Sequence, residues 1–228
     1  MKALCSIGSG PHEELLEISR PTFAAYAERH GYELITSTES DPRRPPAWAK
    51  VPMVREALAS YDLVLWIDAD AVIVDGSRDI AGELAPDRFL GLVGHGERRV
   101  PNTGVMLLRA GEGARDLLDA IWKATRFVHH PWWENAALAD ALGYDLPEAL
   151  EPGLRGRLLR LAARAGIREL RPSAPAGPSR FLAGTQLLPR EWNSVYLDQA
   201  AEPRIVHFPA VPVEQRASDM RVALAGRD

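Results

Sequence analysis

The sequence has very little cysteine and no long apolar run. Cys5 is the single cysteine among 228 residues, so no disulfide can form within the chain. It lies in the apolar stretch ALCSIG, where a cysteine usually packs as a small core residue. No apolar run reaches the roughly 20 residues that span a bilayer, and the N-terminus turns polar too early for a secretory signal. We therefore expect a cytoplasmic protein.

The sequence also lacks an excess of positive charge. The chain has 27 Lys and Arg against 31 Asp and Glu, a formal net charge of −4, which gives no reason to expect a nucleic-acid partner. Lysine occurs only at positions 2, 50 and 123. The hydrophobic content of 46% and charged content of 25% are ordinary for a globular protein. No internal repeat or clear boundary divides the chain, so a single domain over 1–228 is predicted.

Apolar patterning predicts strands that alternate with helices, which favours an α/β domain with a mostly parallel sheet. Pro21 should kink or divide the first helix, and Gly31 should end it. Between about 145 and 183 the pattern weakens, and the structure of the tail is left open. The predicted strands cover 2–9, 32–37, 63–68, 71–76, 88–94, 104–110 and 204–208, and the predicted helices cover 11–32, 48–61, 113–127 and 134–144.

Two carboxylates follow the most apolar strand. LVLWI (63–67) ends at Asp68, and Asp70 comes two residues later. On an extended segment these side chains point the same way, and the carboxyl ends of strands are where α/β sheets bind ligands. Two converging carboxylates repel each other unless a cation lies between them, and a hard divalent cation prefers oxygen ligands. The alternative is a pair of loop residues that cap backbone N–H groups.

The surrounding segments carry a family resemblance. In chain order they are YAERHGYEL (26–34), WAKVPMVREAL (48–58), YDLVLWIDADAVI (61–73), PNTGVMLLR (101–109), WWENAAL (132–138), PREWNSVY (189–196) and IVHF (205–208). Together they resemble the GT-A glycosyltransferases of the galactosyl, mannosyl and xylosyl type, family GT34 (GMA12/MNN10). The sequence departs from the family at Asn135, where Gln is usual, at Trp192, where Phe is usual, and after Phe208, where Gly is absent.

The resemblance implies a fold and an activity. It implies one GT-A, Rossmann-like domain with a nucleotide-binding part at about 1–100, a sugar and acceptor part at about 101–208 and a tail at 209–228. It implies transfer of a hexose or pentose from a UDP- or GDP-linked sugar to an acceptor hydroxyl, with Mn²⁺ or Mg²⁺ and with retention of configuration. The acceptor stays open: a saccharide, a lipid-linked glycan, a natural product or a protein.

The resemblance also implies a metal site. Asp70 would be a direct ligand, Asp68 would bind the metal, the ribose or both, and His207 would be the third ligand, since imidazole suits Mn²⁺. The alternative for His207 is a satisfied core histidine beside Phe208.

Further residues are candidates for the nucleotide. Lys50 would neutralise phosphate, unless it is an exposed helix lysine. Ser6 and Gly8, in the loop SIGSG, would lie against the base or ribose, because glycine permits close backbone approach. An ordinary turn explains this Gly-Ser loop equally well.

The middle of the chain supplies candidates for the sugar. Asn102 and Thr103 would border the donor sugar or the acceptor, and Gly104 would leave room for the ring, unless NTG is an ordinary polar turn. Glu134 and Asn135 are the predicted catalytic pair, near the anomeric carbon. Glu134 is a nucleophile, a charge stabiliser or merely an acid that favours a helix N-terminus. Trp132 and Trp133 form either an apolar wall for a sugar ring or part of the core, and Asn193 and Ser194 are weaker candidates for the rim.

Six arginines lie between 155 and 171, among leucines, in a predicted amphipathic helix. Such a helix either makes weak contact with a membrane surface, holds an anionic acceptor, closes as a lid, or simply covers the domain as a solvated face.

Two other functions fit part of the pattern. Asp-x-Asp-x-Val also occurs in haloacid-dehalogenase-type phosphohydrolases, where the first aspartate is a nucleophile. Those enzymes usually carry it on the first strand and need a later lysine, whereas no lysine follows Lys123. The second alternative is a non-catalytic module that binds a nucleotide sugar.

Overall fold

A six-stranded sheet forms the centre of the protein. The computed structural model describes residues 1–96, 99–144, 146, 154, 157–158, 161, 179–195, 198–209 and 211–226. The strand order is β2-β1-β3-β6-β5-β7, and only β6 runs against the others, because it is antiparallel to both β3 and β5. The predicted mostly parallel sheet is therefore confirmed. The strands are β1 (Lys2–Ile7), β2 (Tyr32–Ser37), β3 (Leu63–Ile67), β5 (Leu90–His95), β6 (Val100–Arg109) and β7 (Thr185–Leu188).

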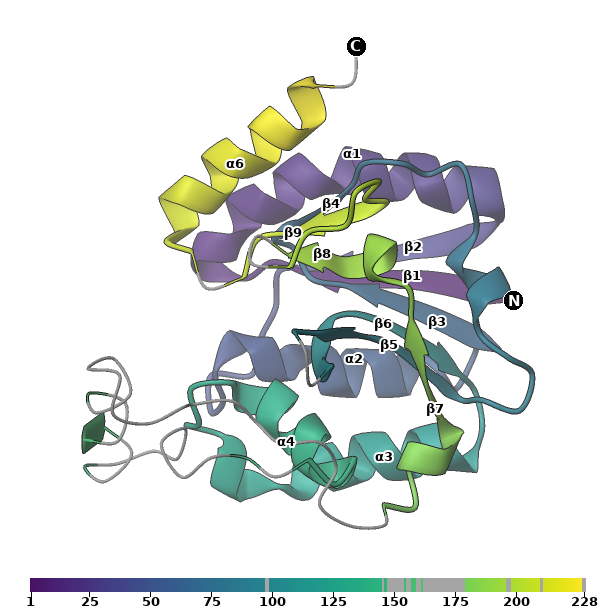
Figure 1. The fold of residues 1–228 in the computed structure, drawn as a ribbon, viewed down its shortest axis with the longest axis vertical. Helices are drawn as coiled ribbons and strands as arrows, with labels where there is room; N and C mark the ends of the chain where they lie inside the picture. The colour runs from purple at the N-terminus through teal and green to yellow at the C-terminus, as the bar shows by residue number, and fades with distance from the viewer. Residues whose placement is uncertain are drawn as a thin grey trace.

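Helices cover both faces of the sheet. In Figure 1, α1 (Glu13–His30) lies above the sheet with α6 (Val213–Ala225) beside it, and α2 (Lys50–Ala57), α3 (Glu112–Lys123) and α4 (Trp133–Ala141) lie below. The sequence of strand β3 is continuously apolar because both faces of the strand are buried. Val64 and Trp66 belong to the core shared with α2 and α3, whereas Leu65 and Ile67 belong to the core shared with α1. No helix among the described residues is long and apolar enough to span a membrane.

A second, three-stranded sheet brings the end of the chain back to the strand that follows the two aspartates. It consists of β4 (Ala71–Ile73), β9 (Ile205–His207) and β8 (Ser194–Val195), in the order β4-β9-β8. The antiparallel register pairs Ala71 with His207. His207 is thereby fixed one residue from Asp70, although 137 positions separate the two in sequence.

The first helix differs from the prediction in one respect. Pro21 lies within α1 and does not divide it. Proline removes one N–H donor, but both Pro21 and Glu17, whose carbonyl loses that partner, are exposed, so water can satisfy the carbonyl. Gly31 ends the helix as predicted, in the left-handed conformation with φ 68°.

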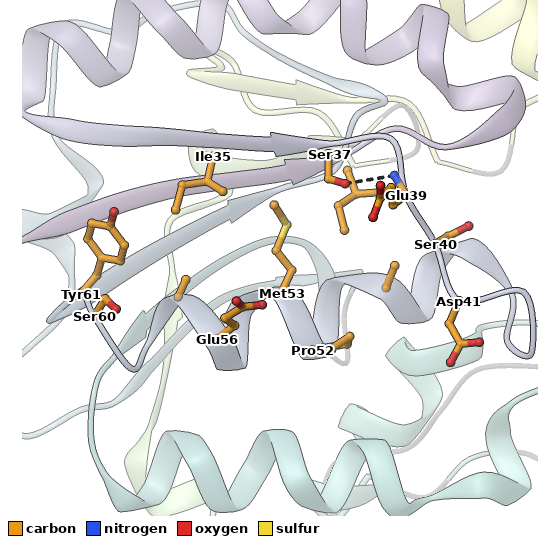
Figure 2. A pocket seen from close by; sticks show the side chains of 13 residues that line it. Ile35, Ser37, Glu39, Ser40, Asp41, Pro52, Met53, Glu56, Ser60 and Tyr61 are labelled. Atoms are coloured by element: carbon orange, nitrogen blue, oxygen red, sulfur yellow. Dashed lines mark hydrogen bonds between the residues drawn. The ribbon is translucent and has the colours of Figure 1, made fainter.

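Strand β2 is an edge strand, and its face toward α2 is partly open (Figure 2). A hollow of about 630 Å³ lies there, and Ile35, Met53 and Tyr61 point into it while Glu39 and Asp41 lie at one end. None of the predicted site residues lines this hollow. It is a consequence of the uncovered edge of the sheet and not of the site described below.

Asp79 ties the N-terminal strand to the loop after β4 and should make stability depend on pH. Its carboxylate accepts hydrogen bonds from Lys2 Nζ at 2.6 Å, Tyr32 Oη at 2.7 Å and Ala81 N at 2.9 Å. Burial alone would raise the pKa of Asp79, but Lys2, Tyr32 and the backbone N–H lower it below its ordinary value. The stabilisation is therefore complete above the unfolded-state pKa of about 4 and is lost as the pH falls through the lower folded-state pKa.

We expect Asp79→Asn to reduce the free energy of unfolding by about 1.5–3 kcal/mol at pH 7, and the difference from wild type to shrink at pH 3. Urea titrations at both pH values measure this. A difference that is the same at both would contradict a charge-dependent role.

Candidate functional site

Two adjoining hollows lie where β3 and β6 meet the small sheet. The larger has a volume of about 450 Å³ and the smaller about 150 Å³. The larger contains Asn102, Thr103, Glu134 and Asn135, and the smaller contains Ser9 and other residues that follow β1. Their shared wall consists of Ala47, Lys50, Asp68, Asp70, Trp133 and Arg216. The acidic pair therefore lies at the junction of the two hollows.

Asp68, Asp70 and His207 form a compact set of metal-ligand groups. One potential ligand atom from each lies within 4.8 Å of the others. His207 Nε2 lies 3.3 Å from Asp70 Oδ1 and 3.9 Å from Asp68 Oδ2. Asp70 and His207 are buried, so these groups are held together away from bulk water. Two carboxylates and an imidazole form a donor set that suits Mn²⁺.

A chain of hydrogen bonds fixes which nitrogen of His207 is available. The backbone N–H of Gly104 donates to Asn102 Oδ1 at 2.8 Å, so this oxygen is an acceptor, and Asn193 Nδ2 donates to it at 3.0 Å. Asn193 Oδ1 is thereby turned toward His207 Nδ1, 3.0 Å away, which must carry the proton. Nε2 is left with a free lone pair that faces the two aspartates. Such an outer hydrogen bond is what orients a metal-binding histidine.

Gly104 is required at this point by the imidazole ring. A Cβ atom at position 104 would lie 2.1 Å from His207 Cε1 and 2.4 Å from His207 Nδ1. The room that was predicted for a sugar ring is thus occupied by the side chain of His207. The carbonyl of Gly104 also accepts a hydrogen bond from the N–H of Asp68 at 2.8 Å. Gly104 therefore contacts both Asp68 and His207.

Arg216 neutralises the second oxygen of Asp70. Its Nη1 donates to Asp70 Oδ2 at 2.8 Å and lies 3.3 Å from His12 Nε2. Burial alone would raise the pKa of Asp70, but the charged groups beside it, Arg216 among them, hold that pKa below its ordinary value. Asp70 is therefore a carboxylate at neutral pH, with Oδ1 toward His207 and Oδ2 toward Arg216.

Lys50 joins the metal-ligand set to the predicted catalytic pair. Its ammonium lies 2.9 Å from Asp68 Oδ1 and 2.9 Å from Glu134 Oε1, and only 3% of the side chain is exposed. Burial alone would lower the pKa of Lys50, but the two carboxylates raise it above its ordinary value. Trp66 Nε1 also donates to Asp68 Oδ1, at 2.7 Å. The alternative of an exposed helix lysine is wrong.

Glu134 is buried, and its two carboxylate oxygens differ in their hydrogen bonding. Oε1 accepts from Lys50 and from Thr103 Oγ1 at 3.0 Å, whereas Oε2 has no hydrogen-bond partner among the described residues. Burial raises the pKa of Glu134 above its ordinary value, against the effect of Lys50. Asn135 Oδ1 accepts the N–H of Thr103 at 2.9 Å. The start of α4 and the NTG segment of β6 therefore form one unit.

The structure places the other predicted residues differently. Ser6 is fully buried, Gly8 lies against the start of α1, where a Cβ would be 2.5 Å from His12 O, and neither lines the two hollows. Their neighbours Ser9 and His12 line the smaller hollow instead. Contact of Ser6 and Gly8 with a nucleotide stays a prediction.

Sequence reasoning missed Arg216 and His12. Arg216 lies in a tail without a strong pattern, and His12 was treated only as part of a helix. The one signal in the sequence for Arg216 was its position as a basic residue after the last strand. Most of the arginine-rich stretch at 154–171 lies outside the described residues.

Comparison with known sequences points to one family. Residues 6–93 match the model of the galactosyl transferase GMA12/MNN10 family. The chain resembles the GMA12/MNN10 family over this segment. It is 34% identical over 106 residues to probable glycosyltransferase 6 of Oryza sativa subsp. japonica, covering 42% of this chain and 22% of that protein. It is 32% identical over 105 residues to xyloglucan 6-xylosyltransferase 2 of Arabidopsis thaliana, covering 41% of this chain and 23% of that protein. The match thus spans less than a quarter of either relative.

Comparison with solved structures agrees on the fold over nearly the whole chain. A glycosyltransferase involved in glycosylation of the PBCV-1 major capsid has a TM-score of 0.61 at 12% identity, covering 97% of this chain and 98% of that one. An active-site mutant of the galactosyltransferase LgtC has a TM-score of 0.56 at 10% identity, covering 98% of this chain and 96% of that one. The fold is therefore that of the GT-A glycosyltransferases, as the GMA12/MNN10 resemblance implies.

Proposed function

We propose that this protein is a metal-dependent, retaining glycosyltransferase. It transfers a hexose or pentose from a UDP- or GDP-linked sugar to an acceptor hydroxyl. The single observation that carries the proposal is the set of Asp68, Asp70 and His207 at the junction of two hollows, within a fold and a sequence segment of glycosyltransferases.

The residues fit a divalent cation. The free lone pair of His207 Nε2, Asp70 Oδ1 and Asp68 Oδ2 face one another, and the Asn193 amide fixes the imidazole. These three residues would hold Mn²⁺ or Mg²⁺. Bound there, the ion would neutralise the negative charge that grows on the diphosphate as it leaves.

Two cations of the chain itself support the same step. Lys50 and Arg216 lie in the shared wall of the hollows, each already paired with one of the two aspartates. They place positive charge where a diphosphate would cross from one hollow to the other. Fixed charges in a buried site stabilise a leaving anion strongly, because they need no reorganisation when the charge appears.

The larger hollow has the chemistry of a sugar site. Asn102, Thr103 and Asn135 line it with groups that hydrogen-bond hydroxyls, and Glu134 lies among them. The anomeric carbon becomes positively charged as the diphosphate departs. The buried carboxylate of Glu134, whose Oε2 has no hydrogen-bond partner in the described part of the chain, is suited to stabilise that charge. The smaller hollow, with Ser9 and His12, would take the ribose and base.

The two alternative functions are separated by different findings. The family match and the fold both point to glycosyltransferases, and neither favours a dehalogenase-type phosphohydrolase. A non-catalytic module would have the same ligand set and is distinguished by turnover.

We expect UDP or GDP to raise the melting temperature only when Mn²⁺ or Mg²⁺ is present, since the ion bridges the diphosphate to the protein. A thermal-shift screen with UDP-xylose, UDP-galactose and GDP-mannose, each with Mn²⁺ or with a chelator, measures this and also indicates base and sugar. Equal stabilisation with the chelator would refute the metal assignment.

Variants connect the thermal shift to the residues. His207→Ala should weaken the metal-dependent shift, and Asp70→Ala should remove both the shift and the release of nucleoside diphosphate. Lys123→Ala, on the exposed face of α3, is the matched control and should change neither. Binding without any release of nucleoside diphosphate by wild type would favour the non-catalytic module.

A further inference from the structure

Trp133 has an exposed side chain and a strained backbone. With 45% of its surface accessible, it is the most exposed tryptophan, tyrosine or phenylalanine that the structure describes. Its φ is 44°, in the left-handed region, which bulky side chains rarely occupy. Neither core packing nor backbone preference therefore explains a tryptophan here.

The turn before α4 holds Trp133 in this conformation. Trp133 N donates to His130 O at 2.9 Å across a tight turn, with Pro131 and Trp132 at its centre. His130 is buried, and its Nδ1 accepts the N–H of Trp132 at 3.0 Å. Asn135 N then donates to Trp132 O at 3.0 Å, so the helix begins at once. Glycine is the residue that such a position favours.

A strained residue persists only where the surroundings enforce it, and such residues concentrate at functional sites. Here the turn delivers three successive side chains to the site. Trp133 lies in the wall shared by both hollows, while Glu134 and Asn135 line the larger hollow alone. The indole is thus adjacent to the hydroxyl-binding groups and to the acidic pair.

We propose that Trp133 stacks its indole ring on the apolar face of the donor pyranose; this rests on the proposed function. A pyranose presents C–H bonds on one face and hydroxyls around its edge. An exposed aromatic ring in a hollow that Asn102, Thr103 and Asn135 also line offers both kinds of contact. The left-handed backbone at Trp133 occurs where this residue lines both hollows.

Binding measurements test the ligand. We expect Trp133→Ala to weaken binding of the sugar nucleotide by about fivefold to tenfold with Mn²⁺, and binding of the free nucleoside diphosphate by less than about twofold. Trp133→Phe should retain most of the affinity, because it keeps a ring. Val222→Ala, which truncates another exposed apolar side chain, is the control and should change neither. Isothermal titration with UDP-xylose, UDP-galactose and GDP-mannose against UDP and GDP measures the difference.

The outcomes separate the possible roles. Equal loss for the free nucleoside diphosphate and the sugar nucleotide would overturn the proposal in favour of stacking on the base. Binding of UDP-xylose, UDP-galactose and GDP-mannose that Trp133→Ala leaves unchanged would also overturn it, because the ring would then not contact the donor sugar. Wild type that binds UDP or GDP with Mn²⁺ but gains nothing from the sugar would refute the stacking alone. Wild type that binds none of these compounds would refute the proposed function as well.

A stability comparison tests the strain without any ligand. Trp133→Gly and Trp133→Ala lose the same contacts of the indole, so their difference reports the backbone. We expect the glycine variant to melt about 2–4 °C higher, the reverse of the usual order in helices. An alanine variant that melts higher would show that position 133 is not held in the left-handed region, and would overturn the strain argument.

Discussion

Replacing Lys50 with methionine is expected to destabilise the protein by about 3–5 kcal/mol, because one buried cation serves two carboxylates. Lys50 is 3% exposed and lies 2.9 Å from both Asp68 and Glu134. Methionine fills much of the same space but leaves the carboxylate of Glu134, only 5% exposed, without a countercharge. Urea unfolding at pH 7 measures the loss of free energy.

The pH dependence of this variant has a defined sign. Burial already raises the pKa of Glu134, and Lys50 opposes that rise. Without Lys50 the folded-state pKa should rise further, so the folded protein would bind the proton more readily than the unfolded chain. The destabilisation should therefore be larger at pH 8 than at pH 5.

Two further variants make the result specific. Lys123→Met alters a lysine that is 77% exposed and should change the free energy of unfolding by no more than about 0.5 kcal/mol. The double variant Lys50→Met, Glu134→Gln removes one stranded charge and should recover part of the loss. If Lys50→Met were as stable as Lys123→Met, the charge cluster would have to be solvated.

The sequence contains enough local information to predict most of the fold. The bounds 32–37 of β2 follow from the segment YELITS after Gly31, and β3 follows from LVLWI, which both cores bury. Helix α6 was not predicted, because its apolar residues do not form a strong stripe. The prediction that Pro21 would kink or divide the first helix was wrong on division, because an exposed helix face tolerates the missing hydrogen bond.

The candidate site could also be predicted only in part. Asp68 and Asp70 could be proposed because carboxylates at a strand end are a local feature, whereas His207 was implied by the family resemblance. The register of β4 with β9 brings the three together. The partners that orient them could not be predicted. Asn102 and Asn193 are 91 positions apart, and Asp70 and Arg216 are 146 apart. Such pairs depend on how the small sheet and α6 pack, which no local pattern records.

Gly104 provides the second large effect, because it decides whether His207 can occupy its place. We expect Gly104→Ala to abolish the stabilisation by Mn²⁺ and nucleoside diphosphate, and to lower the free energy of unfolding by about 1–3 kcal/mol. The new Cβ would lie 2.1 Å from His207 Cε1 and 2.9 Å from Asn102 Oδ1, so the ring and the amide that orients it would both have to move. Position 104 is not in the left-handed region, so alanine can adopt its backbone conformation and the effect is steric.

Gly82→Ala is the matched control, because a Cβ there meets nothing within 4 Å, and it should leave the metal-dependent shift unchanged. The double variant Gly104→Ala, His207→Ala separates fold from site. Removing the imidazole relieves the overlap, so stability should return, while the response to Mn²⁺ should stay absent because a ligand is gone. A Gly104→Ala protein with the full metal-dependent shift would show that His207 Nε2 is not needed to hold the ion, and the ligand set would then reduce to the two aspartates.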